Sequence, residues 1–132
     1  KKVIELQASY YSAHHELGMV AMREADYRAA VKHFSEALRH KPNFRRSQYQ
    51  LGLAMMQMGR PQIAIPQFRG VLRNSPEDPD ARLQLGLALA KTGQIDAAEA
   101  QLREAQWLRP GWSEAESALS ELLDSKAAGA AP

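Results

Sequence analysis

The sequence of 132 residues contains no cysteine and no long uninterrupted hydrophobic segment. Without cysteine, a disulfide framework, a thiolate metal site and a cysteine nucleophile are all excluded. No apolar run approaches the ~20 residues that a membrane-spanning helix needs, so we expect no membrane insertion. No signal peptide is visible either. The cellular compartment, cytoplasmic or periplasmic, stays open.

The sequence also has little excess charge of either sign, because 17 lysine and arginine residues nearly balance 15 aspartate and glutamate residues. A net charge of +2 gives no reason to expect a nucleic-acid partner. With 45% hydrophobic and 24% charged residues, the chain can bury a core and keep a polar surface. Its length is that of one ordinary domain.

Motifs of catalysis are missing too. No glycine-rich phosphate loop is present, and no spacing suggests a Ser-His-Asp arrangement. His33 and His40 can share a helix face that His14 approaches, but no carboxylate is placed beside them to complete a metal site. We therefore expect a non-enzymatic protein with no catalytic residue, no metal and no cofactor.

What the sequence does contain is an internal repeat of 34 residues. Six positions recur at this spacing with the same or a similar residue type: Pro42, Pro76 and Pro110; Leu17, Leu51 and Leu85; Gly18, Gly52 and Gly86; Ala30, Ala64 and Ala98; Phe34, Phe68 and Leu102; Ala37, Val71 and Ala105. Strict repetition of this kind is typical of solenoids, in which each unit packs on its neighbours. A solenoid mainly provides surface, which favours binding over chemistry.

Each period indicates two helices separated by a short polar break. In the first period, apolar residues recur at helical spacing over 11–24, and a second stripe follows over 27–40. Pro42 ends that second helix, because proline cannot continue it and restricts the residue before it. The same plan predicts helices over 45–58, 61–73, 79–91 and 95–108.

A seventh helix is predicted over 113–125. Ser113 and Glu116 match a capping box, and three leucines give the helix one apolar face while its other face is polar. A helix with one polar face suits the end of a stack, where nothing covers the outer side. Residues 126–132, with the sequence KAAGAAP, are expected to form a disordered tail.

The first ten residues allow two interpretations. In the register of the repeat, residues 1–6 stand where a second helix ends in later periods, and Ser9-Tyr10 stands where the link follows. Residues 1–10 are therefore predicted to be the end of a preceding repeat in a longer array, although Ala8 occupies the slot of the later prolines. The alternative is that this segment merely extends the first helix.

A 34-residue period of two helices, with Leu-Gly in the first, alanine and phenylalanine in the second and proline at the exit, resembles the tetratricopeptide repeat. The resemblance covers three units, 11–44, 45–78 and 79–112. It implies an all-α fold, a right-handed superhelical solenoid of antiparallel helix pairs, with 113–125 as a capping helix. Two aromatic positions of the family are only partly kept: His14, Gln48 and Arg82 stand at one, and Tyr27, Pro61 and Ile95 at the other.

In that family the first helix of each unit lines a concave groove, so the resemblance implies binding of a peptide or helical segment there. At 100° per residue, Leu17, Gly18 and Ala21 should point into the stack and the opposite face should line the groove. That face is apolar, as interaction surfaces usually are, although the same residues could instead pack within the stack. The predicted partner-binding residues are His15, Met19, Met22, Arg46, Tyr49, Leu53, Met56, Leu83 and Leu87.

A polar column runs beside this face and consists of Glu16, Gln50 and Gln84. Its side chains could bond to the backbone of an extended peptide, or they could simply form a solvated helix edge. Arg45 lies beside the column and could receive an acidic group. Chaperone-binding members of the family hold a C-terminal carboxylate with lysine and asparagine, and that pattern is missing here.

These patterns predict a protein–protein interaction scaffold or adaptor that binds a partner protein or peptide in a groove. Two alternatives stay open. The stack could be the substrate-recognition arm of a larger enzyme chain. It could also be a self-association module, forming a homo-oligomer through the groove or the front end.

Overall fold

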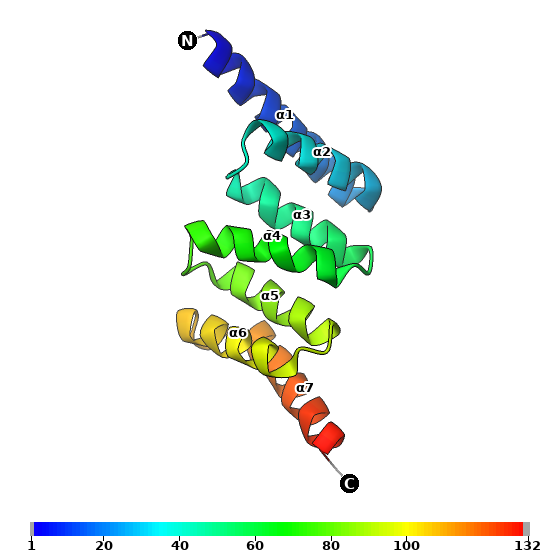
Figure 1. Ribbon diagram of the computed structural model, residues 1–132, viewed down its shortest axis with the longest axis vertical. Coiled ribbons are helices and arrows are strands. Elements are labelled where there is room, and N and C mark those ends of the chain that lie inside the picture. The colour runs from blue at the N-terminus through cyan, green and yellow to red at the C-terminus, as the bar shows by residue number, and fades with distance from the viewer. Residues whose placement is uncertain (1, 131–132) are drawn as a thin grey trace.

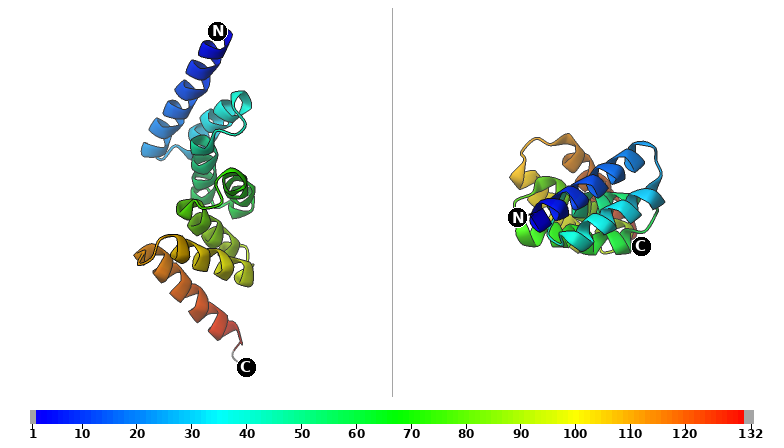
Figure 2. Two further views of the ribbon diagram at one scale, coloured as in Figure 1. Left: turned by 90° about the vertical axis from the view of Figure 1, so that its left-hand side faces the viewer. Right: turned by 90° about the horizontal axis from the view of Figure 1, so that it is seen from above.

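The computed structural model describes residues 2–130, and within them the chain forms seven α-helices and no strand (Figure 1). They are α1 (Lys2–Arg23), α2 (Tyr27–His40), α3 (Arg45–Gln57), α4 (Pro61–Asn74), α5 (Pro79–Lys91), α6 (Ile95–Leu108) and α7 (Ser113–Ala130). Each helix packs antiparallel on the one before it, and the hairpins stack along one axis (Figures 1 and 2). The sequence-based prediction of an all-α solenoid is therefore confirmed. We call α1, α3 and α5 the first helices and α2, α4 and α6 the second helices.

The two helices of each hairpin approach closely because the first helix carries a glycine at the contact. A Cβ added at Gly18 would lie 2.5 Å from Cε1 of Phe34, and one added at Gly52 would lie 2.5 Å from Cε1 of Phe68. Both rings are fully buried. The third hairpin has the same arrangement with a leucine in place of the ring. Since interiors are close-packed, a larger residue would force the helices apart.

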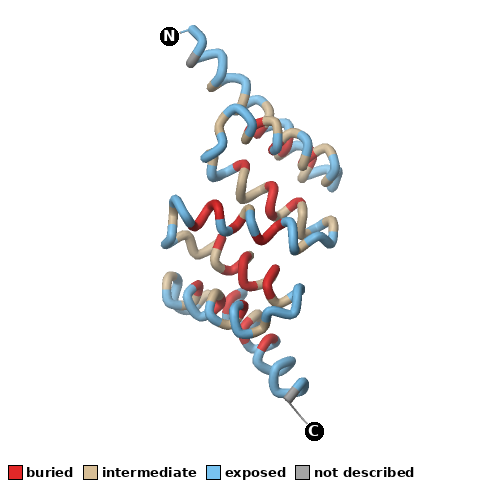
Figure 3. The backbone as a smooth tube through the Cα atoms, in the orientation of Figure 1, coloured by how far each residue is buried: buried red, intermediate tan, exposed pale blue. Residues whose placement is uncertain are grey.

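The buried residues run as a line through the centre of the stack, while both ends of the chain are exposed (Figure 3). One cluster joins the first hairpin to α3, and a second extends from α4 to α7. The contact between the second helix of one repeat and the first helix of the next therefore connects the whole molecule.

The N-terminal segment corrects one prediction. Helix α1 continues unbroken from Lys2 to Arg23, so the link expected at Ser9-Tyr10 is absent and the described residues 2–10 extend the first helix. The reason is Ala8, which favours a helix at the slot where proline breaks it in later repeats. Lys1 lies outside the described residues.

The exposure of Leu17 corrects a second prediction. This side chain was expected to point into the stack, yet it is 48% exposed, whereas the equivalent Leu51 and Leu85 are 6% and 2% exposed. Leu51 packs in one cluster with Phe34 of the preceding repeat. Leu17 has no preceding second helix against it in the described part of the chain.

The C-terminal segment corrects a third prediction. Helix α7 extends to Ala130, so residues 126–130 are helical and not a disordered tail; 131–132 lie outside the described residues. Alanine is the strongest helix former, and Lys126 ties the segment to α6 through Asp96 (3.0 Å) and Glu99 (3.2 Å). These carboxylates, Asp96 foremost, raise the pKa of Lys126.

The start of α7 differs from the predicted capping box. The helix begins at Ser113, and its first helical hydrogen bond runs from the backbone N–H of Glu116 to the carbonyl of Trp112 (3.0 Å). Trp112 therefore occupies the cap position, one residue before the serine that the sequence pattern indicated.

The turn inside each hairpin requires a left-handed residue at the end of the first helix. Gly59 and Gly93 occupy this position with φ of 72° and 83°. The equivalent residue in the first hairpin is Ala25, which has a φ of 57°. Backbone hydrogen bonds close all three turns, for example from the N–H of Asp26 to the carbonyl of Ala21 (2.9 Å).

One buried polar pair joins the first hairpin to the second. His15 is 2% exposed and Ser47 is fully buried, and Nδ1 of His15 lies 2.7 Å from Oγ of Ser47. The imidazole also packs against the rings of Phe34 (5.6 Å) and Phe44 (5.1 Å). Burial, and to a lesser degree the nearby Arg46, lower the pKa of His15, so the ring is neutral near pH 7.

The strain at Ala25 gives a stability prediction. Ala25→Gly should raise the free energy of unfolding by ~1 kcal/mol, because a left-handed conformation is costly for a residue with a Cβ. The matched control is Gly59→Ala, which should lower it by a similar amount, since no atom lies within 4 Å of the added Cβ and only the backbone conformation is strained. Urea denaturation monitored by circular dichroism measures both. Equal stabilities for Ala25→Gly and the parent chain would contradict this account.

Burial of His15 gives a pH prediction. Its folded pKa lies below the unfolded value of 6.5, so the unfolded chain binds more protons as the pH falls through this range. The stability contributed by the neutral ring should be present above pH 6.5 and decrease below it, by at most ~1.4 kcal/mol per pH unit. In His15→Phe, which keeps an aromatic ring, this part of the slope should disappear. Urea titrations at pH 7.5 and 5.5 measure the free energy of unfolding of both chains. If it changed with pH in His15→Phe as much as in the parent chain, His15 would not be responsible.

Candidate functional site

A cavity of about 180 Å³ opens between α1, α3 and the start of α5. Four of the predicted partner-binding residues line it together with the buried His15. The full lining is His15, Met19, Arg45, Arg46, Tyr49, Gln50, Asp78 and Asp80. The lining residues come from α1, from α3 and from the start of α5, so the cavity lies on the face formed by the first helices. In Figure 2 α1 and α7 stand at the two ends of the stack.

Tyr49 is the aromatic residue of this cavity. Its ring packs edge-on against Phe68, with the ring centroids 5.8 Å apart, so the hairpin core holds its position. Burial, followed by the negative charges of Asp80 and Asp78, raises the pKa of Tyr49 to about 12, while the amide of Gln84 acts in the opposite direction. The phenol therefore stays protonated and can donate a hydrogen bond at neutral pH.

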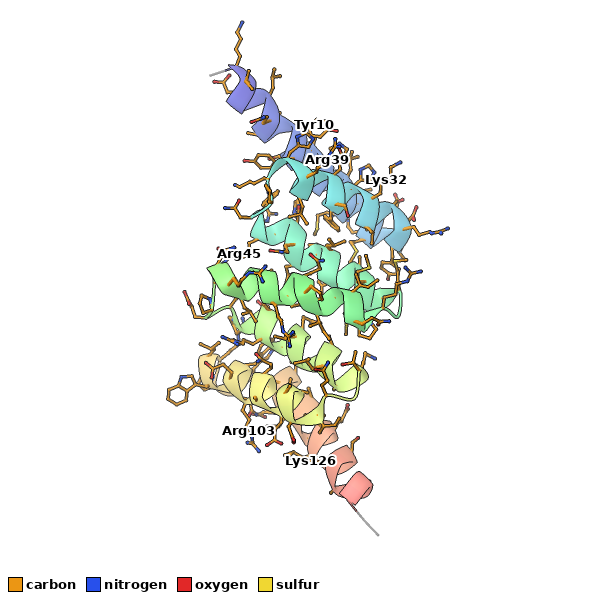
Figure 4. All side chains as sticks on the ribbon, in the orientation of Figure 1. Tyr10, Lys32, Arg39, Arg45, Arg103 and Lys126 are labelled. Carbon is orange, nitrogen blue, oxygen red and sulfur yellow. The ribbon has the colours of Figure 1, made fainter. Side chains whose placement is uncertain are left out.

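Of the charged side chains that line the cavity, some already have a partner within the protein and others do not. Arg45 donates to the hydroxyl of Ser75 (3.1 Å), and Asp78 caps α5 by accepting a backbone N–H of its first turn (3.1 Å). Oδ2 of Asp80 lies 3.6 Å from Nη2 of Arg109. Three of the four charged side chains thus have a protein partner. Figure 4 shows Arg45 at the edge of the stack, beside the turn that leads into α5.

Arg46 and His15 each keep an unused polar group in the cavity. Arg46 is exposed and makes no ion pair or side-chain hydrogen bond with the residues that the structure describes. Nε2 of His15 is buried and also lacks a partner within residues 2–130. Because a buried polar atom is costly when unpaired, Nε2 favours a bound polar group or water.

The other predicted residues do not form one continuous row with this cavity. Leu83 and Leu87 line a second hollow of about 350 Å³ between α5 and α7, with polar residues of α7 on its far side. Met22, Leu53 and Met56 are half-buried and pack against the core clusters.

His15 and Leu83 were predicted to lie on the open groove surface, and this prediction is wrong. Both are only 2% exposed. His15, Tyr49 and Leu83 occupy the same position in three successive repeats, because they are 34 residues apart. His15 is covered by Ser47 of α3 and by the rings of Phe34 and Phe44, and α5, which carries Leu83, likewise contacts α7. The geometry of a single helix could not show that covering contact.

The polar column is only partly assembled into the cavity. Gln50 lines it and is half-buried, Gln84 is half-buried beside Tyr49, and Glu16 is exposed. Whether these side chains contact a ligand backbone stays a prediction.

Asp78 was missing from the predicted site. Asp80 shares the predicted groove face of the third unit but was not among the predicted partner-binding residues, and Arg45 was predicted only as a neighbour of the polar column. The repeat register contained the signal for Asp80, because it stands 34 residues after Arg46 and so starts the next first helix at the equivalent place. Because arginine stands at this position in the second repeat and aspartate in the third, the cavity has one positively charged wall and one negatively charged wall.

The described residues contain no group of three or more histidine or acidic side chains that could hold a metal ion. Nδ1 of His14 does lie 3.1 Å from Nδ1 of His33, and the ring of Tyr10 lies between His14 and His40. None of the helices within residues 2–130 has the length and hydropathy needed to cross a bilayer.

Solved structures resemble this fold closely. The first TPR of Spaghetti (RPAP3), bound to the HSP90 peptide SRMEEVD, superposes with a TM-score of 0.87 at 14% identity, over 90% of this chain and 94% of that one. The Arabidopsis OM64 TPR domain gives 0.85 at 20% identity, over 88% and 96%. The type III secretion translocator chaperone SycD of Yersinia enterocolitica gives 0.83 at 19% identity, over 90% and 87%. At these identities the similarity establishes the fold alone.

No curated protein sequence matches the chain significantly. Two sequence models described as tetratricopeptide repeat match it, one over residues 49–115, which is half of the chain, and one over residues 11–44. The second match has the same limits as the first predicted unit. The chain belongs to the tetratricopeptide repeat family and folds as a right-handed superhelical solenoid.

Proposed function

We propose that this protein is an interaction scaffold that holds a segment of a partner protein in the cavity between α1, α3 and α5. The observation that supports this most is the lining itself, which combines the apolar side chains of Met19 and Tyr49 with charges on two walls. Apolar surface provides affinity, and charged groups at its edge provide orientation and specificity.

The chemistry of the lining indicates what the segment should carry. Met19 is adaptable and Tyr49 is rigid, so together they suit one apolar side chain of the ligand. Arg46 has no protein partner among the described residues, whereas Asp80 already faces Arg109 at 3.6 Å. The free charge of the cavity is therefore positive, and we propose a segment with an acidic residue next to an apolar one. The unpaired Nε2 of His15 offers a further polar contact.

The segment we propose is internal to its chain and not a C-terminal tail. The HSP90 peptide in the RPAP3 complex is a feature of that protein. In this chain the groove positions that the family uses to hold a terminal carboxylate carry His15, Met19, Tyr49 and Leu53 instead of lysine and asparagine. One arginine suits a single side-chain carboxylate.

A random-peptide library selected against the purified chain tests this proposal. Selected peptides should combine an acidic and an apolar residue, and Met19→Glu should weaken their binding tenfold or more, which is about 1.4 kcal/mol. Arg46→Ser should weaken it by ~0.2–1 kcal/mol and reduce its salt dependence, as expected for a solvent-accessible ion pair. Fluorescence anisotropy with labelled peptides measures both effects.

The matched controls are Arg69→Ser and Ile63→Glu. Both side chains are exposed on α4, away from the cavity lining. These variants should bind the selected peptides like the parent chain, with circular dichroism confirming unchanged helix content for all four. If the control and cavity variants bind equally well, the cavity is not the binding site.

A further inference from the structure

Helix α1 carries an apolar stripe that the rest of the structure leaves uncovered. Five of the eight large hydrophobic side chains that are exposed in the described chain lie on this one helix. With one alanine between them, they form what we call the α1 stripe: Val3, Leu6, Tyr10, Ala13, Leu17 and Val20.

The spacing of the α1 stripe is that of a two-helix contact. Its members follow one another at intervals of three, four, three, four and three residues. This is the heptad pattern whose a and d positions face a partner helix, sustained here over almost the whole of a 22-residue helix. A helix of this length is ~33 Å long. An isolated exposed leucine needs no explanation, but a continuous apolar stripe does.

The repeat shows directly that this face is built to be covered. The stripe residues Ala13, Leu17 and Val20 are exposed. Their equivalents one and two repeats later, at 34-residue spacing, are all buried: Ser47, Leu51 and Ala54 on α3, and Ala81, Leu85 and Ala88 on α5. There the preceding second helix covers them.

A preceding repeat in the usual register does not fit as the cover. Repeats two and three are each reached through a turn, at 41–44 and 75–78, which lets the preceding second helix fold back onto the next first helix. The equivalent residues 7–10 are helical and continue α1. The N-terminal part of α1 therefore projects past the end of α2, and the stripe continues along it (Figures 1 and 2).

The opposite end of the stack does not fit as the cover either. The outer surface of α7 exposes mostly acidic and hydroxyl side chains, including Glu116, Ser120, Glu121 and Asp124, with Leu123 at 36% exposure as its large hydrophobic residue. Burying the α1 stripe against it would leave charges without partners. Among the described surfaces, the one with a matching apolar stripe is α1 itself.

We propose that the chain forms a two-fold dimer in which the α1 stripes of two copies pack against each other. An isologous contact requires a self-complementary surface. The α1 stripe meets this condition because apolar side chains recur along its whole length, and one heptad position beside it carries charges of both signs, with Lys2 and Arg23 positive and Glu16 negative. Tyr10, a member of the stripe, is held in place by the hydrogen bond that its hydroxyl donates to Glu36 (3.0 Å), close to Arg39 (Figure 4).

The area of such a contact indicates a reversible dimer. Standard interfaces bury roughly 30–40 Å² per contributing residue, so roughly half of the α1 residues would bury on the order of 400 Å² per copy. That is below the roughly 800 Å² per partner of a stable complex, and the dimer should dissociate on dilution.

Sedimentation equilibrium or light scattering of the purified chain over a concentration series tests the proposal. The mass should rise from 14.7 kDa towards twice that value as the concentration increases. Leu6→Glu and Leu17→Glu should each hold it at the monomer value. Their side chains are 69% and 48% exposed, so helix content should not change. Leu6 also lies on the projecting part of α1, so Leu6→Glu decides the question even if Leu17→Glu lowers stability.

Two matched variants keep the proposal falsifiable. Leu123→Glu places the same change on α7 at the other end of the stack, and Met19→Glu places it in the cavity. Both should dimerise like the parent chain. A parent chain that stays at 14.7 kDa at every concentration would overturn the proposal. Loss of association in Leu123→Glu would instead indicate head-to-tail stacking, and loss in Met19→Glu alone would indicate association through the cavity; either result overturns it.

Discussion

The structure depends on the contact between the second helix of one hairpin and the first helix of the next. A single hairpin cannot bury both of its apolar sides, so each needs a neighbour in the same register. Gly18 and Gly52 set the spacing within their hairpins by admitting the rings of Phe34 and Phe68. Those rings, together with Leu51, then form the surface on which the neighbouring hairpin packs. Any face that lacks a neighbour remains exposed, whatever its residues are.

The sequence alone was sufficient to predict the helices that belong to the repeated hairpins. The limits of α2, α5 and α6 agree with prediction because strong local signals mark them, such as Pro42 after α2 and the capping carboxylate of Asp78 before α5. The two ends were predicted wrongly for separate reasons. At the N-terminus the repeat register was followed although Ala8 stands in the slot of the later prolines, and the segment 126–130 was judged by its small, weakly apolar side chains. At Ala8 and in the segment 126–130, helix propensity and the ion pairs of Lys126 decide the structure instead.

The candidate site was predictable only in part, for a different physical reason. A helical wheel correctly grouped Met19, Arg46 and Tyr49, which the structure brings into one cavity. It wrongly placed His15 and Leu83 on the open surface. His15 is buried by Ser47 of α3 and the rings of Phe34 and Phe44, and Leu83 lies in the core cluster that extends from α4 to α7. A single helical wheel contains none of these contacts between helices. The packing of α5 beside α3 likewise brings Asp78 and Asp80 into one cavity with Arg45 and Arg46.

The two proposed contacts are physically independent because they use different sides of α1. At 100° per residue, Met19 and His15 lie roughly opposite the centre of the stripe formed by residues such as Leu6 and Leu17. Pairing of two copies through the stripe would therefore leave both cavities open. A dimer would then present two binding sites at a fixed separation, and a partner with two suitable segments would be held more tightly than by either site alone. A weak, concentration-dependent dimer would suit such a scaffold, because a bivalent partner would itself stabilise the pairing by mass action.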